Sequence, residues 1–271
     1  MTPLVLPWFK LEPIALWGFI KLQPFGLLAA FAVLVGARFA QQRAKQLDIH
    51  ASVLTDFLTW TTLVGLISAY VLNGLMYFPE DFWAALKDPP QLLQRYWGLS
   101  SYGGFLGGLV TAVVFCRRRQ LSLSALGDAW CYAIPFAWVF ARMGCFVVHD
   151  HPGAVSNFFL AVDNYNGGGV PRHDLGLYEV LWALAVAPLF YHLARSPRAP
   201  GFFLTLIPVL YGPMRFALDF LRATPAEGGD IRYLGLTPAQ YLSLALSIAG
   251  VVLLTRLQRP AATATGTGPS A

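Results

Sequence analysis

Charged side chains are scarce in this sequence. Lys, Arg, Asp and Glu together make up 12% of the 271 residues, whereas hydrophobic residues make up 56%. A typical soluble domain carries about 25% charged residues, and the mean hydropathy of this chain is +0.54. The shortage of charge excludes an ordinary soluble domain and predicts an integral membrane protein.

Cysteine is almost as scarce, and the common metal and hydrolase motifs are missing. Cys116, Cys131 and Cys145 are too few and too dispersed for a disulfide framework or a cysteine metal cluster. The sequence has neither a HExxH segment nor a Cys-His ligand spacing, so we expect no metal and no cofactor. The weaker alternative is a metal site built from His149, Asp150, His151 and His173. The absence of a GxSxG elbow argues against a serine hydrolase.

Long apolar segments are plentiful, and seven of them approach the roughly 20 residues that a membrane helix needs. They are approximately residues 23–40, 53–78, 102–116, 125–148, 176–193, 201–221 and 237–254. The predicted fold is an all-α integral membrane protein with about seven transmembrane helices. Residues 1–258 would form a single transmembrane domain, and the small polar residues 259–271 a disordered cytoplasmic tail.

The basic residues predict the orientation of this domain. They gather in alternate connections, which contain Arg38, Arg43 and Lys45, then Arg117, Arg118 and Arg119, then Arg195 and Arg198, and finally Arg256 and Arg259. Scattered basic residues of this kind do not indicate a nucleic-acid partner. Because basic loops stay in the cytoplasm, we expect the N-terminus outside and the C-terminus inside. Residues 1–22 and the loop 149–175 would then form a small cap on the outer face.

Arginines stand out at the predicted outer ends of the helices. Arg142 follows an apolar run, and a charge within the membrane costs about 2.5 to 3.5 kcal/mol on insertion scales. Arg215, Asp219 and Arg222 recur at helical spacing and share one face. Arg142 alone is equally well explained by a snorkelling side chain or by an ion pair with Asp150 or Asp219, and the other three residues by a structural arginine–aspartate–arginine ladder. Three arginines in one leaflet predict an anionic phospholipid headgroup as ligand, since the guanidinium fork suits a phosphodiester.

Two further segments lie at the same predicted level. SSYGGFLGG, residues 100–108, contains glycines that let another helix or a lipid headgroup approach closely. Simple helix packing explains these glycines equally well. RHDLGLYE, residues 172–179, offers His173, Asp174 and Glu179, which suit a helix cap or an ordered loop.

These segments resemble the motifs of the prolipoprotein diacylglyceryl transferase family. SSYGGFLGG resembles its SFHGG-type motif, and IPFAWVFARMGCFVVHDHPG resembles its PFxxxxGRxGNFxNxExxG signature. RHDLGLYE is similar to its HPSQLYE, and YGPMRFALDFLR resembles its YGxxRFxxEFxR. GLTPAQYLSL resembles the start of the family's last helix. The motifs occur in the family's order within roughly residues 23–254.

The resemblance implies an enzyme of the bacterial cytoplasmic (inner) membrane. It would transfer the sn-1,2-diacylglyceryl group from phosphatidylglycerol to the lipobox cysteine thiol in the signal peptide of a preprolipoprotein, forming a thioether and releasing glycerol phosphate. Arg142 and Arg215 would act in catalysis by holding the phosphate and stabilising its developing charge. Tyr102, His149 and Asp150 are the other candidate catalytic residues. Substrate-binding residues are expected at Gly103, Gly104, Cys145, Gly153, Asp219 and Arg222.

Four positions depart from the family's motifs. Tyr102 stands where the motif has histidine, Cys145 where it has asparagine, Asp150 where it has glutamate, and Phe25 where it has tyrosine. A thiol nucleophile must lose its proton, because the thiolate is the reactive form. We expect His149 or His151 to supply the missing imidazole, oriented by Asp150. The alternative function is that of a family relative that binds or moves phospholipid, or modifies another acceptor, without this activity.

Overall fold

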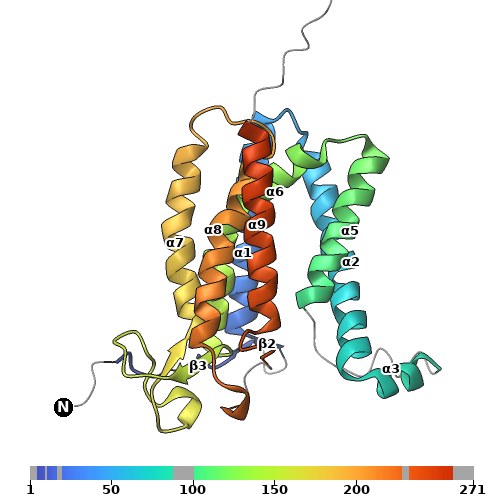
Figure 1. Cartoon of the computed structure of the whole chain (residues 1–271). Coiled ribbons are helices and arrows are strands. Elements are labelled where there is room, and N and C mark those ends of the chain that lie inside the picture. The colour runs from blue at the N-terminus through green and yellow to red at the C-terminus, as the bar shows by residue number, and fades with distance from the viewer. Residues whose placement is uncertain (1–4, 10, 17–19, 88–100, 228–231, 259–271) are drawn as a thin grey trace, which may run out of the picture. The chain divides into compact units, whose positions relative to one another are not determined.

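Long helices dominate the chain. The computed structural model describes residues 5–9, 11–16, 20–87, 101–227 and 232–258. Within these ranges the helices are α1 (Pro24–Gln46), α2 (Ala51–Tyr77), α3 (Pro79–Leu86), α5 (Ser101–Arg119), α6 (Leu123–Val148), α7 (Leu175–Leu193), α8 (Phe202–Leu218) and α9 (Pro238–Gln258) (Figure 1). Each of the seven apolar segments of the sequence falls on one long helix.

Six of these helices are long and apolar enough to cross a membrane, namely α1, α2, α6, α7, α8 and α9. The chain is therefore a helical, multi-pass membrane protein. The remaining long helix, α5, ends in Arg117, Arg118 and Arg119, which shortens its apolar part. A seventh crossing through α5 stays a prediction, as does the orientation of the termini.

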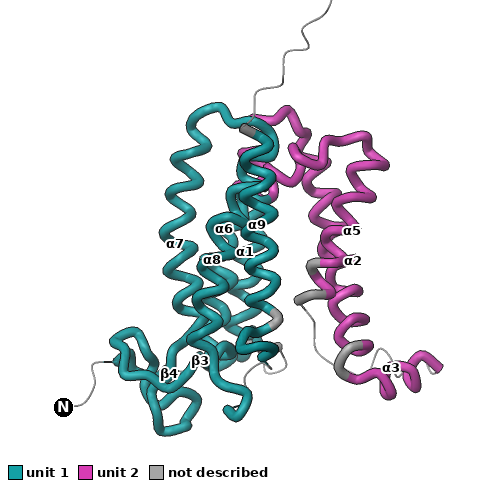
Figure 2. The backbone as a smooth tube through the Cα atoms, viewed as in Figure 1, with its two compact units in different colours: residues 1–36, 131–271 teal, residues 37–130 magenta. Residues whose placement is uncertain are grey.

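The chain divides into two compact units, of which the smaller comprises residues 37–130 (Figure 2). In this unit α2 packs along α5. A Cβ atom on Gly103 would lie 2.3 Å from the Ser68 carbonyl oxygen, so a larger residue would push the helices apart. A buried ion pair joins Arg43 Nε to Asp128 Oδ2 at 2.7 Å and ties the end of α1 to the start of α6.

The larger unit comprises residues 1–36 and 131–271 (Figure 2). It contains most of α6 together with α7, α8 and α9, and α8 packs closely against α9. At Gly212 of α8, a Cβ atom would lie 2.8 Å from the Ser243 carbonyl oxygen of α9. The close approach of these two helices fixes the end of α8, where Arg215 and Asp219 lie.

Short strands and loops gather at one end of the larger unit (Figure 1). Strand β1 (Ile14–Leu16) pairs with β2 (Ile20–Leu22), and β3 (Pro152–Val155) pairs with β4 (Arg172–Asp174), both antiparallel. Single helical turns follow at Tyr165–Gly167, Asp219–Leu221 and Pro225–Glu227. The Leu6 amide donates to the Ala161 carbonyl at 2.8 Å, and Leu6 accepts from Asp163 at 2.8 Å. The N-terminal segment and the loop after α6, both expected in the cap, are thus hydrogen-bonded to each other.

Candidate active site

Arg142 of α6 is held in one orientation by a carboxylate and an indole ring. Its Nε atom lies 2.8 Å from Glu179 Oε2, and its side chain is 20% exposed. The same carboxylate oxygen accepts a hydrogen bond from Trp138 Nε1 at 3.0 Å. The guanidinium carbon lies 4.9 Å from the centre of a Trp138 ring, a distance typical of a cation–π contact. The acidic partner of Arg142 is therefore Glu179, and not Asp150 or Asp219.

Glu179 is a site residue that the sequence analysis missed. It lies in the second turn of α7, and its side chain is only 2% exposed. The sequence suggests a helix cap or an ordered loop for Glu179, but the cap of α7 is Asp174, which accepts from the Leu177 amide at 3.1 Å. The available signal was an acidic residue inside an apolar helix, because such a group needs a cation or a hydrogen-bond donor nearby.

Aromatic rings from three helices surround this ion pair. Tyr211 of α8 packs edge-on against Trp138 of α6, with ring centroids 5.3 Å apart. It also packs edge-on against Trp182 of α7, at 5.4 Å. Apolar rings keep water away from the charges, and charges interact more strongly where water is excluded. The site around Arg142 is thus suited to binding a second charged group.

Asp219, immediately after α8, holds two more arginines. Arg215 Nη1 lies 2.9 Å from Asp219 Oδ1, and Arg222 Nε lies 3.2 Å from the same atom. The Thr237 hydroxyl donates to the other carboxylate oxygen. Asp219 is fully buried, whereas Arg215 and Arg222 are 14% and 21% exposed. Both arginines expected from the spacing lie against Asp219, although α8 ends at Leu218 and Arg222 follows a single 3₁₀ turn with an extended backbone.

Gly153 occupies a position where only glycine fits. A Cβ atom there would lie 2.6 Å from His173 Cβ and 2.6 Å from the Leu221 carbonyl oxygen. Gly153 pairs with Arg222 through an isolated β-bridge, and its carbonyl accepts from Arg172 Nη1 at 2.9 Å. This glycine joins the loop after α6 to the segment that contains Arg222.

His149 is buried and has both ring nitrogens occupied. Its Nδ1 lies 2.8 Å from Asp174 Oδ2, and its Nε2 lies 2.9 Å from the Phe9 carbonyl oxygen. Tyr165 donates to the same Asp174 oxygen at 3.2 Å. Burial, followed by the charge of Asp174, raises the pKa of Tyr165, so its hydroxyl remains a donor. His149 thus connects the N-terminal segment, the end of α6 and the start of α7.

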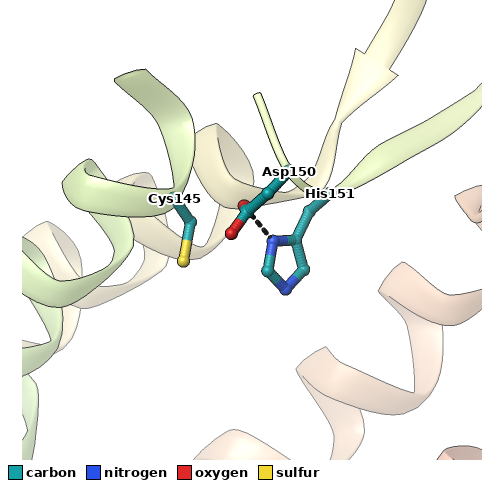
Figure 3. Close-up of side chains that lie close together, drawn as sticks. All are labelled: Cys145, Asp150 and His151. Atoms are coloured by element: carbon teal, nitrogen blue, oxygen red, sulfur yellow. Dashed lines mark hydrogen bonds and ion pairs between the residues drawn. The ribbon is translucent and has the colours of Figure 1, made fainter. Parts of the chain in front are cut away.

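His151 lies in a different environment, two residues further on. Its Nδ1 is hydrogen-bonded to Asp150 Oδ1, and the two side chains are 28% and 43% exposed. Both lie beside the buried Cys145 (Figure 3). The hydrogen bond with Asp150, and then that with Cys145, raises the pKa of His151 to about 9 against the opposing effect of burial. Arg142 Nη1 lies 3.8 Å from Cys145 Sγ, so this cluster adjoins the arginine site.

The metal site considered in the sequence, from His149, Asp150, His151 and His173, is not assembled among the described residues. His149 is bound to Asp174 and Phe9, as above. His173 Nδ1 lies 2.6 Å from the Tyr178 hydroxyl, and burial lowers the pKa of His173. The grouping that does form in the described part of the chain contains Cys145, Asp150 and His151.

The remaining candidate residues lie in the smaller unit, on α5. The backbone of Tyr102 is helical, but its side chain lies outside the described residues. Gly103 contacts α2, as described above, which supports a packing role. Gly104 has no atom within 4 Å of the position that a Cβ would take, so its surface is open. A substrate-binding role for both glycines stays a prediction.

Comparisons with known proteins place most of the chain in one family. The family model described as prolipoprotein diacylglyceryl transferase matches residues 13–256. Three relatives are named phosphatidylglycerol–prolipoprotein diacylglyceryl transferase. The protein of Rhodospirillum rubrum is 28% identical over 94% of this chain and 95% of its own. The protein of Idiomarina loihiensis is 28% identical over 90% of this chain and 91% of its own. The protein of Staphylococcus saprophyticus is 27% identical over 90% of this chain and 88% of its own. The chain belongs to the prolipoprotein diacylglyceryl transferase family.

Proposed function

We propose that this chain transfers the sn-1,2-diacylglyceryl group of phosphatidylglycerol to the lipobox cysteine of preprolipoproteins. The acceptor sulfur forms a bond to the glyceryl carbon that carries the phosphate ester. The carbon–oxygen bond to the phosphate breaks, and glycerol phosphate leaves with that electron pair. The thiol proton passes to a base on the enzyme, and the product is a thioether.

Three partly buried arginines of the larger unit carry this proposal. Arg142 lies against Glu179, and Arg215 and Arg222 both lie against Asp219. A diester phosphate would be a further anion for these guanidinium groups. Charge grows on the phosphate as it leaves, and guanidinium groups fixed in advance stabilise it best. Glu179 binds Arg142 through Nε, and Nη1 lies 3.8 Å from Cys145 Sγ, so a phosphate would bind the guanidinium beside that sulfur.

His151 is the better candidate for the base. His149 is 2% exposed, and its ring nitrogens already contact Asp174 and Phe9, so it has no free lone pair for a substrate proton. His151 is partly exposed and is oriented by Asp150. An imidazole held by a carboxylate is the usual arrangement for activating a thiol or hydroxyl nucleophile. In this account His149 positions the segment that carries Asp150 and His151.

The membrane arrangement that suits this reaction has the site in the outer leaflet. Seven crossings, an outer N-terminus and a cytoplasmic C-terminus would place the strands and loops of residues 1–22 and 149–175 outside. Residues 1–258 would form one transmembrane domain in the bacterial cytoplasmic membrane. The tail 259–271 lies outside the described residues. Exported signal peptides and phosphatidylglycerol would both be accessible at that level.

A transfer assay tests the proposal. The purified protein would be placed in phosphatidylglycerol liposomes with a lipobox peptide, and the peptide mass would show any added diacylglyceryl group. We expect addition by the wild type and loss of at least 100-fold in Arg142→Ala, whereas Arg119→Ala keeps its activity, since Arg119 is an exposed partner of Asp56. Lipid binding without any transfer by the folded wild type would favour the alternative of a phospholipid-binding relative.

A further inference from the structure

The cluster at the end of α6 has the composition of a metal site. The donor atoms of Cys145, Asp150 and His151, namely the sulfur, a carboxylate oxygen and a ring nitrogen, all lie within 4.8 Å of one another (Figure 3). We propose that these residues bind a thiophilic divalent cation, with Zn²⁺ as the best match, and that the bound ion blocks the enzyme. The ion is an inhibitor in this proposal and not a cofactor.

The backbone brings these three residues together and holds them. His149 has a φ of +50°, a left-handed conformation that ends α6 and turns the chain back. The Asp150 amide points to the Cys145 carbonyl oxygen, 3.5 Å away, and the His151 carbonyl accepts from the Leu175 amide at 3.1 Å. Because the backbone is fixed on both sides of the cluster, only side-chain rotation is needed to bind an ion.

The distances and ligand types suit zinc. Bonds of about 2.0 to 2.3 Å at tetrahedral angles separate the donor atoms by about 3.5 Å, and these atoms already lie within 4.8 Å. One thiolate and one carboxylate offset the charge of a divalent ion. A thiolate with an imidazole favours Zn²⁺ over Mg²⁺ or Ca²⁺, which prefer oxygen ligands. Three protein ligands leave a fourth position open to water or a substrate thiol.

The surroundings make the site accessible and place it beside the proposed chemistry. Asp150 and His151 are 43% and 28% exposed, so an ion can reach them. Arg142 Nη1 lies 3.8 Å from Cys145 Sγ and can donate to a metal-bound thiolate. Inhibition rests on the proposed function, because the ion would occupy the imidazole that accepts the substrate proton. Cys145 stands where the family's motif has asparagine, so the thiolate ligand comes from a departure of this chain.

Direct metal binding tests the site independently of activity. Co²⁺ would be titrated into the purified, full-length protein in detergent, with a thiolate-to-cobalt absorption band in the near ultraviolet as the readout and Zn²⁺ as the competitor. We expect the band in the wild type and in Cys131→Ser, a buried cysteine elsewhere in α6. Cys145→Asn should abolish it, and His151→Ala should weaken binding at least tenfold. The proposal is overturned if no band forms, or if the band persists in Cys145→Asn.

A second experiment separates this proposal from the proposed function. Zn²⁺ added to the liposome transfer assay should reduce wild-type transfer at least tenfold, and a chelator should restore it. Unchanged transfer at Zn²⁺ concentrations that displace Co²⁺ would overturn the inhibitory role. If the folded, metal-free protein shows no transfer but the cobalt band forms, the proposed function fails and the metal site stands. The melting temperature of Cys145→Asn is the control for folding. If it lies near that of the wild type, the loss of the cobalt absorption band reflects the loss of a ligand.

Discussion

Two histidines just after α6, His149 and His151, each pair with a carboxylate, yet the surroundings of the two pairs differ completely. The His149–Asp174 pair is 1% and 0% exposed and connects three segments of the larger unit. The His151–Asp150 pair is 28% and 43% exposed and adjoins Cys145 and the Arg142 site. Burial and spare lone pairs, and not residue type, separate a structural histidine from one available for chemistry.

The difference arises from the turn between the two residues. His149 adopts a left-handed conformation, and its ring contacts Asp174 and the Phe9 carbonyl. Asp150 and His151 instead lie near Cys145 in the last turn of the helix. Two histidines close in the sequence thus have different surroundings, and the predictions below test that difference.

The largest effect is expected from removing the imidazole of His151. We expect His151→Ala to lower the transfer rate by about 10²- to 10⁴-fold, the usual contribution of a general base, with a melting temperature close to that of the wild type. Rates from the liposome assay and melting curves in detergent would be compared for the same preparation. A large loss of stability in His151→Ala would mean that the His151–Asp150 pair is structural, as the His149–Asp174 pair is.

Removing the imidazole of His149 should act on stability instead. His149→Ala removes one of the hydrogen-bond partners of the buried Asp174, and a lost hydrogen bond to such a group typically costs about 1.5–3 kcal/mol of the free energy of unfolding. Denaturant or thermal unfolding in detergent measures this loss, with His151→Ala as the matched control. Wild-type stability in His149→Ala would contradict the structural role of the buried pair.

A smaller effect on the transfer rate is expected from removing the charge of Glu179. Glu179→Gln keeps the shape of the side chain but removes the charge that orients Arg142. We expect kcat/KM for phosphatidylglycerol to fall about 10- to 100-fold, because a small displacement of a positioning group has costs of this size. The control is Glu227→Gln, which alters a surface pair with Arg172 and should change little. Equal effects in both variants would argue against a specific role for Glu179.

The pH dependence of the transfer rate also tests the role of His151, through a smaller effect. His151 has a pKa raised to about 9 by Asp150 and Cys145, so the neutral, proton-accepting form increases as the pH rises through 9. The wild-type rate should therefore rise about fourfold between pH 7.5 and 9, because ionisation of the acceptor thiol, whose free pKa is about 8.5, offsets part of the gain in neutral imidazole. A chelator in all buffers removes divalent metals. A wild-type rate that is constant or falls over this range would contradict a neutral His151 as the base.

The sequence predicted the helices well because membrane helices follow from length and hydropathy alone. All seven apolar segments coincide with long helices, and six meet the requirements of a membrane span. The Arg215–Asp219 pair was also predictable, since its partners are four residues apart, whereas Arg222 reaches Asp219 from an extended residue after a 3₁₀ turn. Local spacing was sufficient in both cases.

Contacts between distant segments were not predictable in the same way. Glu179 and Arg142 are 37 positions apart, and their pairing depends on how α6 and α7 pack. The roles of His149 and His151 depend on a single left-handed residue and on the Phe9 carbonyl, 140 positions from His149. Neither burial nor a backbone acceptor can be recognised from the residues beside a histidine.

The most direct test of His151 as the substitute base is the transfer rate without its imidazole. Transfer to a lipobox peptide would be measured for the wild type and His151→Ala in chelator-treated phosphatidylglycerol liposomes. We expect a loss in His151→Ala of about 10²- to 10⁴-fold. Wild-type transfer by His151→Ala would contradict the account, because the proton of the acceptor thiol would then be removed without this imidazole.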